Sequence, residues 1–335
     1  MKKICVLPGD GIGPEVVGCA VEVLRHATND LEFVEGKIGQ ASFRATGTYL
    51  TDETLDLMRS CDSTLFGAVS TPETSDYVSP VLRFRRELDL YASVRPVKSY
   101  ARLRAGPAID VVIIRENSEG MYAGKEVSDI NGVTTMRRVT RRACERIVKF
   151  AIDYSLKNGR SSVCCVHKAN VLRSSDGLFL SVFKEKMAAE GGALKGRDQL
   201  VDSSAMHLVT DPARFDVVVT LNLYGDILSD VAAGVAGGLG FAPTGNIGDR
   251  YSVFEPAHGS APDIEGSGKA NPTAAILSGA MMLRHIGMPE EAADVEKAVA
   301  SVYQSGHLTQ DLGGRHDSAS FTERVVREIR SRNAL

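Results

Sequence analysis

Short apolar runs alternate with segments of helical periodicity along the chain, and this alternation constrains the fold more than any other feature. Runs that are apolar on both faces are typical of strands buried in a sheet, and they span 3–7, 63–67, 110–114, 161–166 and 215–221. Apolar residues at helical spacing predict helices at 14–26, 51–59, 80–88, 140–157, 175–189, 271–285, 290–304 and 319–331. The alternation predicts an α/β fold with a largely parallel, open sheet and helices on both faces.

The chain has 335 residues, of which 43% are apolar and 24% are charged, and its net charge is -3. This composition is typical of globular enzymes and argues against a disordered chain or a polyanion-binding protein. One hydrophobic core seldom extends over such a length, so we expect two domains or one large α/β domain.

Two segments interrupt the alternation. Between about 119 and 139 valines lie among polar residues, and Asn131-Gly132 is a strong hairpin signal. This segment predicts an antiparallel excursion from the sheet at a second domain or a dimer contact. The glycine-rich stretch 234–248 is predicted to be a hinge or a loop.

No apolar run approaches the roughly 18 residues of a membrane helix, and the first strand starts without the apolar core of a signal peptide. We therefore expect a cytoplasmic protein. The six cysteines show no CxxC spacing, and four lie inside apolar stretches. This usage predicts buried free thiols over disulfides or zinc ligands.

The first glycine turn, 8–14, follows a strand and opens a helix, as dinucleotide-binding loops do. A G-x-G-x-x-G fingerprint that starts at Gly9 would need its third glycine at position 14, which is Pro14. We favour a tight turn, with a phosphate or nucleotide site as the alternative.

Two aspartates follow the most apolar strand, at the sheet edge where open α/β folds bind ligands. If 224–233 is helical, Asp226 and Asp230 lie at i and i+4 on one face, where their charges repel. A bound Mg²⁺ or Mn²⁺ would offset this repulsion. The alternative is a solvated helix start with acids near the positive end of its dipole.

Three arginines are placed to bind carboxylates. Arg85 lies on a predicted helix, Arg95 follows an apolar stretch, and Arg115 stands at the end of a strand. A guanidinium matches a carboxylate with two parallel hydrogen bonds, so this set suits a di- or tricarboxylate. A neighbouring basic run has no such placement and is predicted to be a solvated face: Arg137, Arg138, Arg141 and Arg142.

Three further positions are open to two interpretations each. Lys168, at a strand end, is either a general base in a partly desolvated crevice or an exposed loop lysine. Tyr122 is either a proton donor or an ordinary tyrosine. The loop 258–264 either holds the ribose hydroxyls of a nucleotide through Asp263 or is a structured surface loop.

Taken in order, these segments resemble the β-decarboxylating dehydrogenases, the family of isocitrate, 3-isopropylmalate and homoisocitrate dehydrogenases. The motifs that carry the resemblance span nearly the whole chain and lie at 8–13, 115–117, 167–170, 222–230 and 255–264. The resemblance implies an isopropylmalate dehydrogenase-like fold of two domains. Residues 1–90 and 237–335 would form a cofactor-binding domain, and 91–236 a domain for substrate, metal and dimerisation.

The resemblance also implies roles for individual residues. The implied catalytic residues are Tyr122, Lys168 and Asp202. The implied substrate-binding residues are Ser79, Val81, Leu82, Arg85, Arg95, Arg115, Tyr122, Lys168 and Asn170. The implied NAD-binding residues are His258, Gly259, Ser260, Ala261, Asp263, Ile264 and Asn271. The implied ligands of Mg²⁺ or Mn²⁺ are Asp202, Asp226 and Asp230.

In the family, the equivalents of Lys168 and Asp202 reach the site from a second subunit, which implies a homodimer with shared active sites, with a tetramer as the alternative. The implied reaction is an NAD-dependent oxidative decarboxylation of a small 3-substituted malate. Lys168, through Asp202, takes the hydroxyl proton, and Tyr122 supplies the final one. Asp263-Ile264 resembles the NAD-using members, since those preferring NADP have lysine and tyrosine there. Neither a nucleic acid nor a membrane is implied as a partner.

The substrate depends on the helix that leads to Arg85. Its sequence, Ser-Pro-Val-Leu-Arg-Phe-Arg at 79–85, resembles fungal and methanogen-type homoisocitrate dehydrogenases. We therefore predict conversion of homoisocitrate, and of longer homologues, to 2-oxoadipate or its homologues, as in lysine or coenzyme B synthesis. Val81 and Leu82 also suit the isopropyl group of 3-isopropylmalate, the substrate in leucine biosynthesis, and Arg83 either meets a distal carboxylate or points to solvent.

Three other functions stay open. An NAD-dependent isocitrate dehydrogenase would share the malate-binding core. A metal-free hydroxyacid dehydrogenase would leave the Asp226 and Asp230 pair unexplained. A non-catalytic regulatory subunit, a class known in this family, is disfavoured because Tyr122, Lys168 and the three aspartates are all present.

Overall fold

The computed structural model describes residues 1–72, 77–100, 107–122 and 124–333, which form two compact units. Of the described residues, unit 1 contains 1–72, 77–89, 100 and 237–333, and unit 2 contains 90–99, 107–122 and 124–236. The chain returns from unit 2 to unit 1 at Gly237, inside the glycine-rich stretch. Whether these units act as cofactor and substrate domains stays a prediction.

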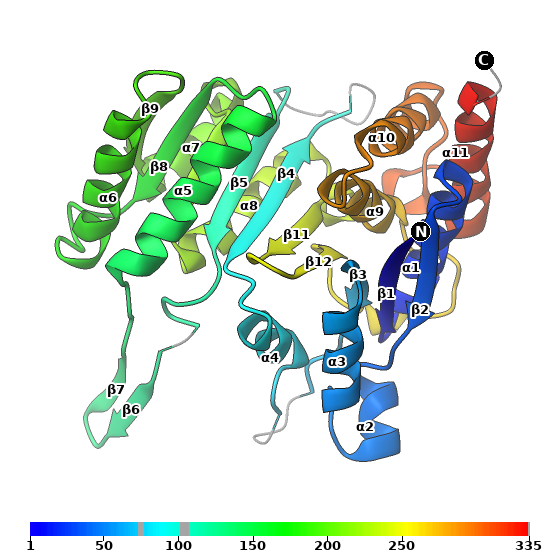
Figure 1. Cartoon of the computed structure of the whole chain (residues 1–335), viewed down its shortest axis with the longest axis horizontal. Coiled ribbons are helices and arrows are strands. Elements are labelled where there is room, and N and C mark those ends of the chain that lie inside the picture. The colour runs from blue at the N-terminus through cyan, green and yellow to red at the C-terminus, as the bar shows by residue number, and fades with distance from the viewer. Residues whose placement is uncertain (73–76, 101–106, 123, 334–335) are drawn as a thin grey trace. The chain divides into compact units, whose positions relative to one another are not determined.

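Unit 1 contains a sheet in the order β2-β1-β3-β12-β11 (Figure 1). The strands are β1 Lys2–Gly9, β2 Leu31–Glu35, β3 Ser63–Ala68, β11 Pro243–Ile247 and β12 Ser252–Pro256. All run parallel except β11, which pairs antiparallel with β12. The sheet is mostly parallel, as the apolar runs predicted.

The main core of unit 1 lies between this sheet and four packed helices (Figure 1). These helices are α1 Gly13–Ala27, α9 Thr273–His285, α10 Pro289–Gln304 and α11 Ser318–Asn333. Three shorter helices complete the unit: α2 Gln40–Thr46, α3 Asp52–Ser60 and α4 Pro80–Glu87. Short 3-10 turns lie at Leu239–Phe241, Pro262–Ile264 and Gln310–Leu312.

Unit 2 has a second group of strands in the order β4-β5-β10-β8-β9. They are β4 Ala92–Lys98, β5 Asp110–Glu116, β8 Ser162–His167, β9 Lys195–Leu200 and β10 Val217–Thr220. Only β4 is antiparallel to its neighbour. Helices cover both faces (Figure 1): α5 Arg141–Lys157 and α6 Ser175–Ala189 on one, α7 Val201–Thr210 and α8 Asn222–Ala236 on the other.

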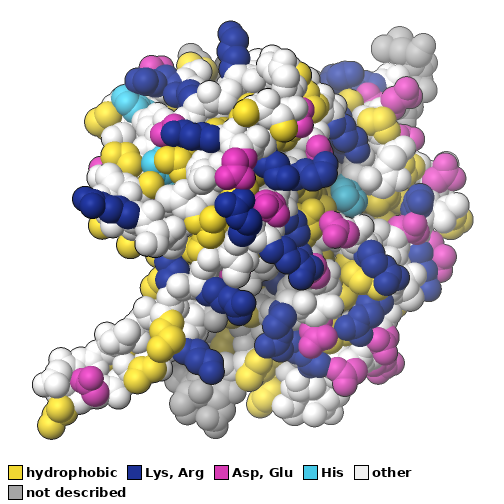
Figure 2. Space-filling model, turned by 60° about the vertical axis from the view of Figure 1, so that its left-hand side comes forward, with side chains coloured by type: hydrophobic (Ala, Val, Ile, Leu, Met, Phe, Trp, Pro, Cys, Tyr) yellow, Lys and Arg dark blue, Asp and Glu magenta, His cyan; other side chains and the backbone are white. Residues whose placement is uncertain are grey.

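A hairpin arm, β6 Glu126–Asp129 and β7 Gly132–Thr135, projects from the rest of unit 2 (Figure 1). Every side chain of its two strands is exposed, and Figure 2 shows hydrophobic side chains at its tip and near its base. The predicted antiparallel excursion is thus present. Its two-residue turn is Ile130-Asn131, however, one position earlier than predicted, because Gly132 already pairs with Asp129.

The cysteines are free thiols, and five of the six are buried. Burial raises the pKa of Cys5 and of Cys144 to about 12, so these thiols stay protonated and inert. The predicted buried free thiols are thus confirmed. No helix in the described part of the chain is long and apolar enough to span a membrane.

Candidate active site

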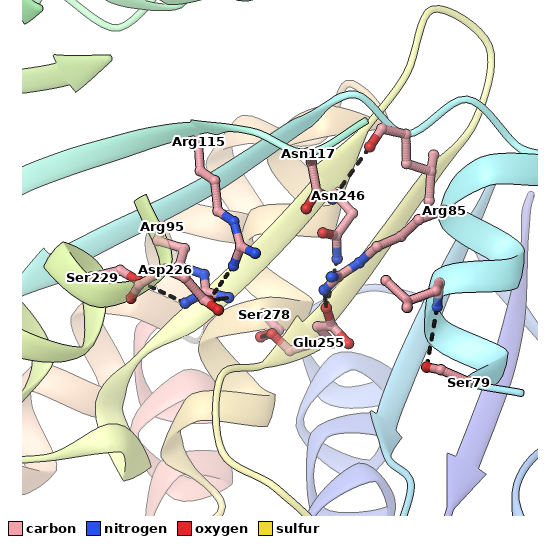
Figure 3. A network of polar contacts seen from close by, with 12 residues as sticks. Ser79, Arg85, Arg95, Arg115, Asn117, Asp226, Ser229, Asn246, Glu255 and Ser278 are labelled. Carbon is pink, nitrogen blue, oxygen red and sulfur yellow. Dashed lines mark hydrogen bonds and ion pairs between the residues drawn. The ribbon is translucent and has the colours of Figure 1, made fainter. Parts of the chain in front are cut away.

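Arg95 and Arg115 of unit 2 meet Asp226 where β4, β5 and α8 pack together (Figure 3), and Asp230 lies beside Arg95. Arg115, which is 3% exposed near the end of β5, contacts Asp226 Oδ1 through its Nη1. Arg95 of β4 lies 3.4 Å from the same oxygen and 3.5 Å from Asp230 Oδ1. Its Nη1 also donates to Ser229 Oγ at 2.6 Å. Two predicted carboxylate binders therefore lie against two predicted metal ligands.

Arg95 offsets the like-charge repulsion between Asp226 and Asp230. The prediction that 224–233 is helical is correct, and Asp226 and Asp230 share a face of α8. Arg95 contacts both carboxylates, so the repulsion does not by itself require a metal. Loss of hydration raises the pKa of Asp230 above its usual value, although Arg95 opposes that shift.

Tyr122 extends the cluster. Its hydroxyl donates to Asp226 Oδ2, and the Arg115 guanidinium lies 5.1 Å from the centre of its ring. Burial, with the nearby carboxylate of Asp226, raises the pKa of Tyr122 above its usual value. The hydroxyl therefore keeps its proton at neutral pH, as a proton donor must.

Lys168 and Asp202 form a separate pair in unit 2. Lys168 follows β8, and its Nζ donates to Asp202 Oδ1 of α7 at 2.6 Å. The ammonium of Lys168 lowers the pKa of Asp202, which is 62% exposed. Asn170, two residues beyond Lys168, is exposed.

The three predicted metal ligands are not assembled within one copy of the chain. Among the described residues, no three His, Cys, Asp or Glu side chains are grouped closely enough to hold a metal ion. Asp226 and Asp230 supply carboxylate oxygens, the donors that Mg²⁺ and Mn²⁺ prefer. One copy therefore offers two of the three predicted ligands at α8.

Sequence reasoning missed a buried ion pair behind Lys168. Asp176, near the start of α6, is fully buried, and its Oδ2 accepts the backbone N–H of Lys168 at 2.7 Å. Its Oδ1 accepts from Arg137 Nη1, also at 2.7 Å. The prediction of a solvated face is therefore wrong for Arg137, although Arg141 is half exposed as expected. No local pattern signals a pair that is 39 residues apart.

Arg85 of unit 1 lies in a second polar group (Figure 3). Its Nη2 donates to Glu255 Oε1 at 2.8 Å, and Asn246 Nδ2 donates to the same oxygen at 2.7 Å. Glu255 lies near the end of β12 and Asn246 lies on β11, so the sheet fixes the position of the carboxylate that holds Arg85. Arg85 Nε is buried and has no hydrogen-bond partner within the described residues.

The first turn of α4 carries the predicted substrate contacts of unit 1. Ser79 caps the helix, because its Oγ accepts the N–H of Leu82 at 3.3 Å. Leu82 is 46% exposed and Val81 is partly exposed. Arg83, which was predicted to meet a distal carboxylate or solvent, instead donates to Leu50 O and Asp52.

The glycine turn after β1 packs against the backbone of its neighbours. A Cβ at Gly9 would lie 1.9 Å from Ala68 O, and one at Gly11 would lie 2.0 Å from Ser260 O. Ile12 N donates to the same Ser260 oxygen at 2.8 Å. Both glycines have positive φ, so the structure explains them as parts of a tight turn.

The predicted NAD-binding residues lie in unit 1. Gly259, Ser260, Ala261, Asp263 and Ile264 belong to the loop that contacts this turn, while Asn271 precedes α9 and donates to Asp311 Oδ2 at 3.0 Å. His258 Nδ1 donates to Gly259 O at 3.0 Å. Burial lowers the pKa of His258 and favours its neutral form.

Comparison with known proteins gives consistent matches. Residues 3–329 match the family described as isocitrate/isopropylmalate dehydrogenase. The 3-isopropylmalate/3-methylmalate dehydrogenase of Methanocaldococcus jannaschii is 46% identical over 98% of this chain and 99% of its own length. The isocitrate/homoisocitrate dehydrogenase of Thermus thermophilus is 47% identical, again over 98% and 99%. The structure of isocitrate dehydrogenase from Methylococcus capsulatus superposes with a TM-score of 0.94 at 42% identity, covering 98% of this chain and all of that one.

Proposed function

The chain belongs to the isocitrate/isopropylmalate dehydrogenase family, and from that premise we propose that it oxidises and decarboxylates a 3-substituted malate with NAD and a divalent metal. The observation that best supports this proposal is the contact of Arg95, Arg115 and Tyr122 with Asp226 in unit 2. Two guanidinium groups that can bind substrate carboxylates and a protonated phenol therefore contact one carboxylate that can bind a metal.

The protein residues have distinct tasks in this reaction. Arg95 and Arg115 bind the carboxylates of the malate core, since each guanidinium supplies a fork of donors. Lys168 of a second copy, after losing its ammonium proton to solvent through Asp202, would take the proton of the hydroxyl group, and bound NAD would supply the acceptor for the hydride. The β-keto acid then loses CO₂, and Tyr122 donates a proton to the carbon that carried it.

Asp226 and Asp230 of one copy, with Asp202 of a second, would hold the metal. When bound there, Mg²⁺ or Mn²⁺ would supply Lewis-acid chemistry, which would lower the pKa of the substrate hydroxyl and stabilise negative charge during decarboxylation. Arg95 contacts both carboxylates of α8, and Arg115 and Tyr122 also contact Asp226, so a bound metal would take over carboxylate oxygens that these side chains now contact.

A homodimer is part of this proposal, with a tetramer as the alternative. The hairpin arm is too short to be stable alone, and its exposed Val127, Ile130 and Val133 need a partner surface. Exposed apolar residues also lie on the packed pair α7 and α8: Met206, Val209, Leu223 and Ile227. A second copy seated on these surfaces would bring its Asp202 and Lys168 to the site.

We propose homoisocitrate as the substrate, from the sequence of the segment 79–85. One observation favours 3-isopropylmalate as the second candidate: Leu50 O and Asp52 hold Arg83, which leaves the apolar Val81 and partly exposed Leu82 to meet the substituent. An apolar pair suits an alkyl group better than a third carboxylate.

Steady-state kinetics with homoisocitrate, 3-isopropylmalate and isocitrate, each with NAD and Mg²⁺, test the proposal. We expect the highest kcat/KM with homoisocitrate. A higher kcat/KM with 3-isopropylmalate would change the substrate and leave the reaction class intact. No turnover with any of the three would contradict the reaction class and favour a regulatory subunit.

A further inference from the structure

Asn222 is the first residue of α8, and its side chain is buried against Arg115. Its Oδ1 accepts two N–H groups of that arginine, from Nε at 3.0 Å and from Nη2 at 2.7 Å. Its Nδ2 donates to the backbone oxygen of Glu119 at 2.7 Å. Asn222 and Arg115 are each only 3% exposed, so water does not compete strongly for these bonds.

The two bonds fix the plane of the guanidinium. Nε and Nη2 form one edge of the Arg115 fork, and a single oxygen that accepts from both leaves Nη1 directed at Asp226. An amide oxygen is neutral, so it orients Arg115 and leaves the charge of the guanidinium intact. A carboxylate at position 222 would instead neutralise that charge. The full positive charge is kept for Asp226 and for a substrate carboxylate.

Close packing supports the same arrangement. A Cβ at Gly225, one turn along α8, would lie 2.6 Å from Arg115 Cβ, so the helix presses on the stem of the arginine. A Cβ at Gly120 would lie 3.2 Å from Asn222 Cβ, and Gly120 has a φ of +92°. Both glycines therefore let Asn222 approach the arginine and the turn after β5.

The same amide also holds the turn that leads to Tyr122. Glu119 O is its acceptor, and the buried carboxylate of Glu116 accepts the N–H groups of Ser118 and Glu119 at 2.8 and 3.1 Å. Tyr122 follows three residues later. One side chain thus connects the carboxylate-binding arginine with the turn that carries the proton donor.

We propose that Asn222 is a positioning residue, which orients Arg115 towards the substrate carboxylate and holds the 116–122 turn so that Tyr122 reaches Asp226. This inference rests on the proposed function, because Arg115 and Tyr122 act on substrate only if the chain is a 3-substituted malate dehydrogenase. Asn222 itself does not contact the substrate.

Asn222→Ala tests the inference. Removal of two hydrogen bonds to a charged group should lower kcat/KM for the malate substrate by about 10- to 100-fold, while KM for NAD changes by less than about twofold. Asn158→Ala is the matched control, since Asn158 also donates an amide N–H to a carbonyl in unit 2, that of Tyr154 at 2.8 Å, but on the exposed end of α5. It should leave both values unchanged.

A double-mutant cycle separates positioning from general stability. Lysine at position 115 lacks the Nε and Nη2 fork. In an Arg115→Lys background, the further change Asn222→Ala should therefore lower kcat/KM for the malate substrate by less than about threefold. Equal effects in both backgrounds would overturn the inference. If Asn222→Ala does not fold, Asn222→Asp keeps the shape but pairs with Arg115 and loses the donor, and it should raise the substrate KM at least about tenfold.

An NMR measurement keeps the inference testable without turnover. The Nε–H resonance of Arg115, identified by its loss in Arg115→Lys, should be sharp and protected from exchange in the wild type. It should shift or broaden in Asn222→Ala. An unchanged resonance would overturn the inference, whereas a wild type that turns over no malate derivative would overturn only the proposed function.

Discussion

Replacement of Arg137 by methionine should destabilise the protein strongly. Arg137 is the ion-pair partner of Asp176, a fully buried carboxylate, at 2.7 Å, and its guanidinium also lies 5.3 Å from the centre of the Tyr224 ring. Removing one partner of a buried pair leaves an uncompensated charge, which costs about 3–5 kcal/mol. For a chain of this size we expect the Tm to fall by about 5–15 °C.

Arg141→Met is the matched control. Arg141 pairs with Glu185 at 2.9 Å, and both side chains are more than half exposed, so water and salt screen the pair. Its loss should move the Tm by no more than about 3 °C. Thermal unfolding of both variants, followed by circular dichroism at equal protein concentration, measures the difference.

The two substituted arginines lie four residues apart in one basic run, so the comparison isolates the effect of burying the ion pair. If Arg137→Met lowers the Tm no more than Arg141→Met does, the buried pair is not important for stability and the reasoning is refuted. A second consequence follows at the site, because Asp176 also accepts the N–H of Lys168. A shifted Lys168 should lower kcat at temperatures where Arg137→Met is still folded.

Three further predictions concern the proposed reaction. Lys168→Met should lower kcat by about 100-fold or more with an unchanged circular dichroism spectrum, because the hydroxyl proton then has no acceptor; near-normal turnover would contradict the role of Lys168. Burial and Asp226 raise the pKa of Tyr122, so its hydroxyl stays protonated up to about pH 10, and its deprotonation should not lower activity at any pH under that value. A decline of activity under about pH 9 that disappears in Tyr122→Phe would contradict this prediction. Burial lowers the pKa of His258, so the ring is neutral and KM for NAD should stay constant between about pH 6.5 and 8; a steep change across that range, absent in His258→Gln, would show that the histidine titrates there.

Much of the sheet could be predicted because its central strands are apolar on both faces. β5 and β10 are buried along nearly their whole length, and their runs stand out in the sequence. Sequence analysis missed β9, whose residues Lys195–Leu200 are mainly polar because it is an edge strand with little buried surface. It missed β11 because proline and glycine, at Pro243 and Gly245, usually signal a loop.

The site residues could be predicted only where a short-range sequence pattern indicates them. The helical spacing of Asp226 and Asp230 and the strand-end place of Arg115 follow from periodicity, and the structure has both. The contact of Arg95 with both aspartates depends on how β4 packs on α8, and no pattern within a short window contains it. The partners of Arg83 and Arg137 were missed for the same reason, since each lies more than thirty residues away.

The stoichiometry of the reaction tests the central claim most directly. With homoisocitrate, NAD and Mg²⁺, NADH measured by absorbance and CO₂ measured by trapping should form in equal amounts, and excess EDTA should stop both until Mg²⁺ is restored. Asp226→Asn should form neither product, because it removes a proposed metal ligand. NADH without CO₂, or full activity in EDTA, would contradict a metal-dependent oxidative decarboxylation.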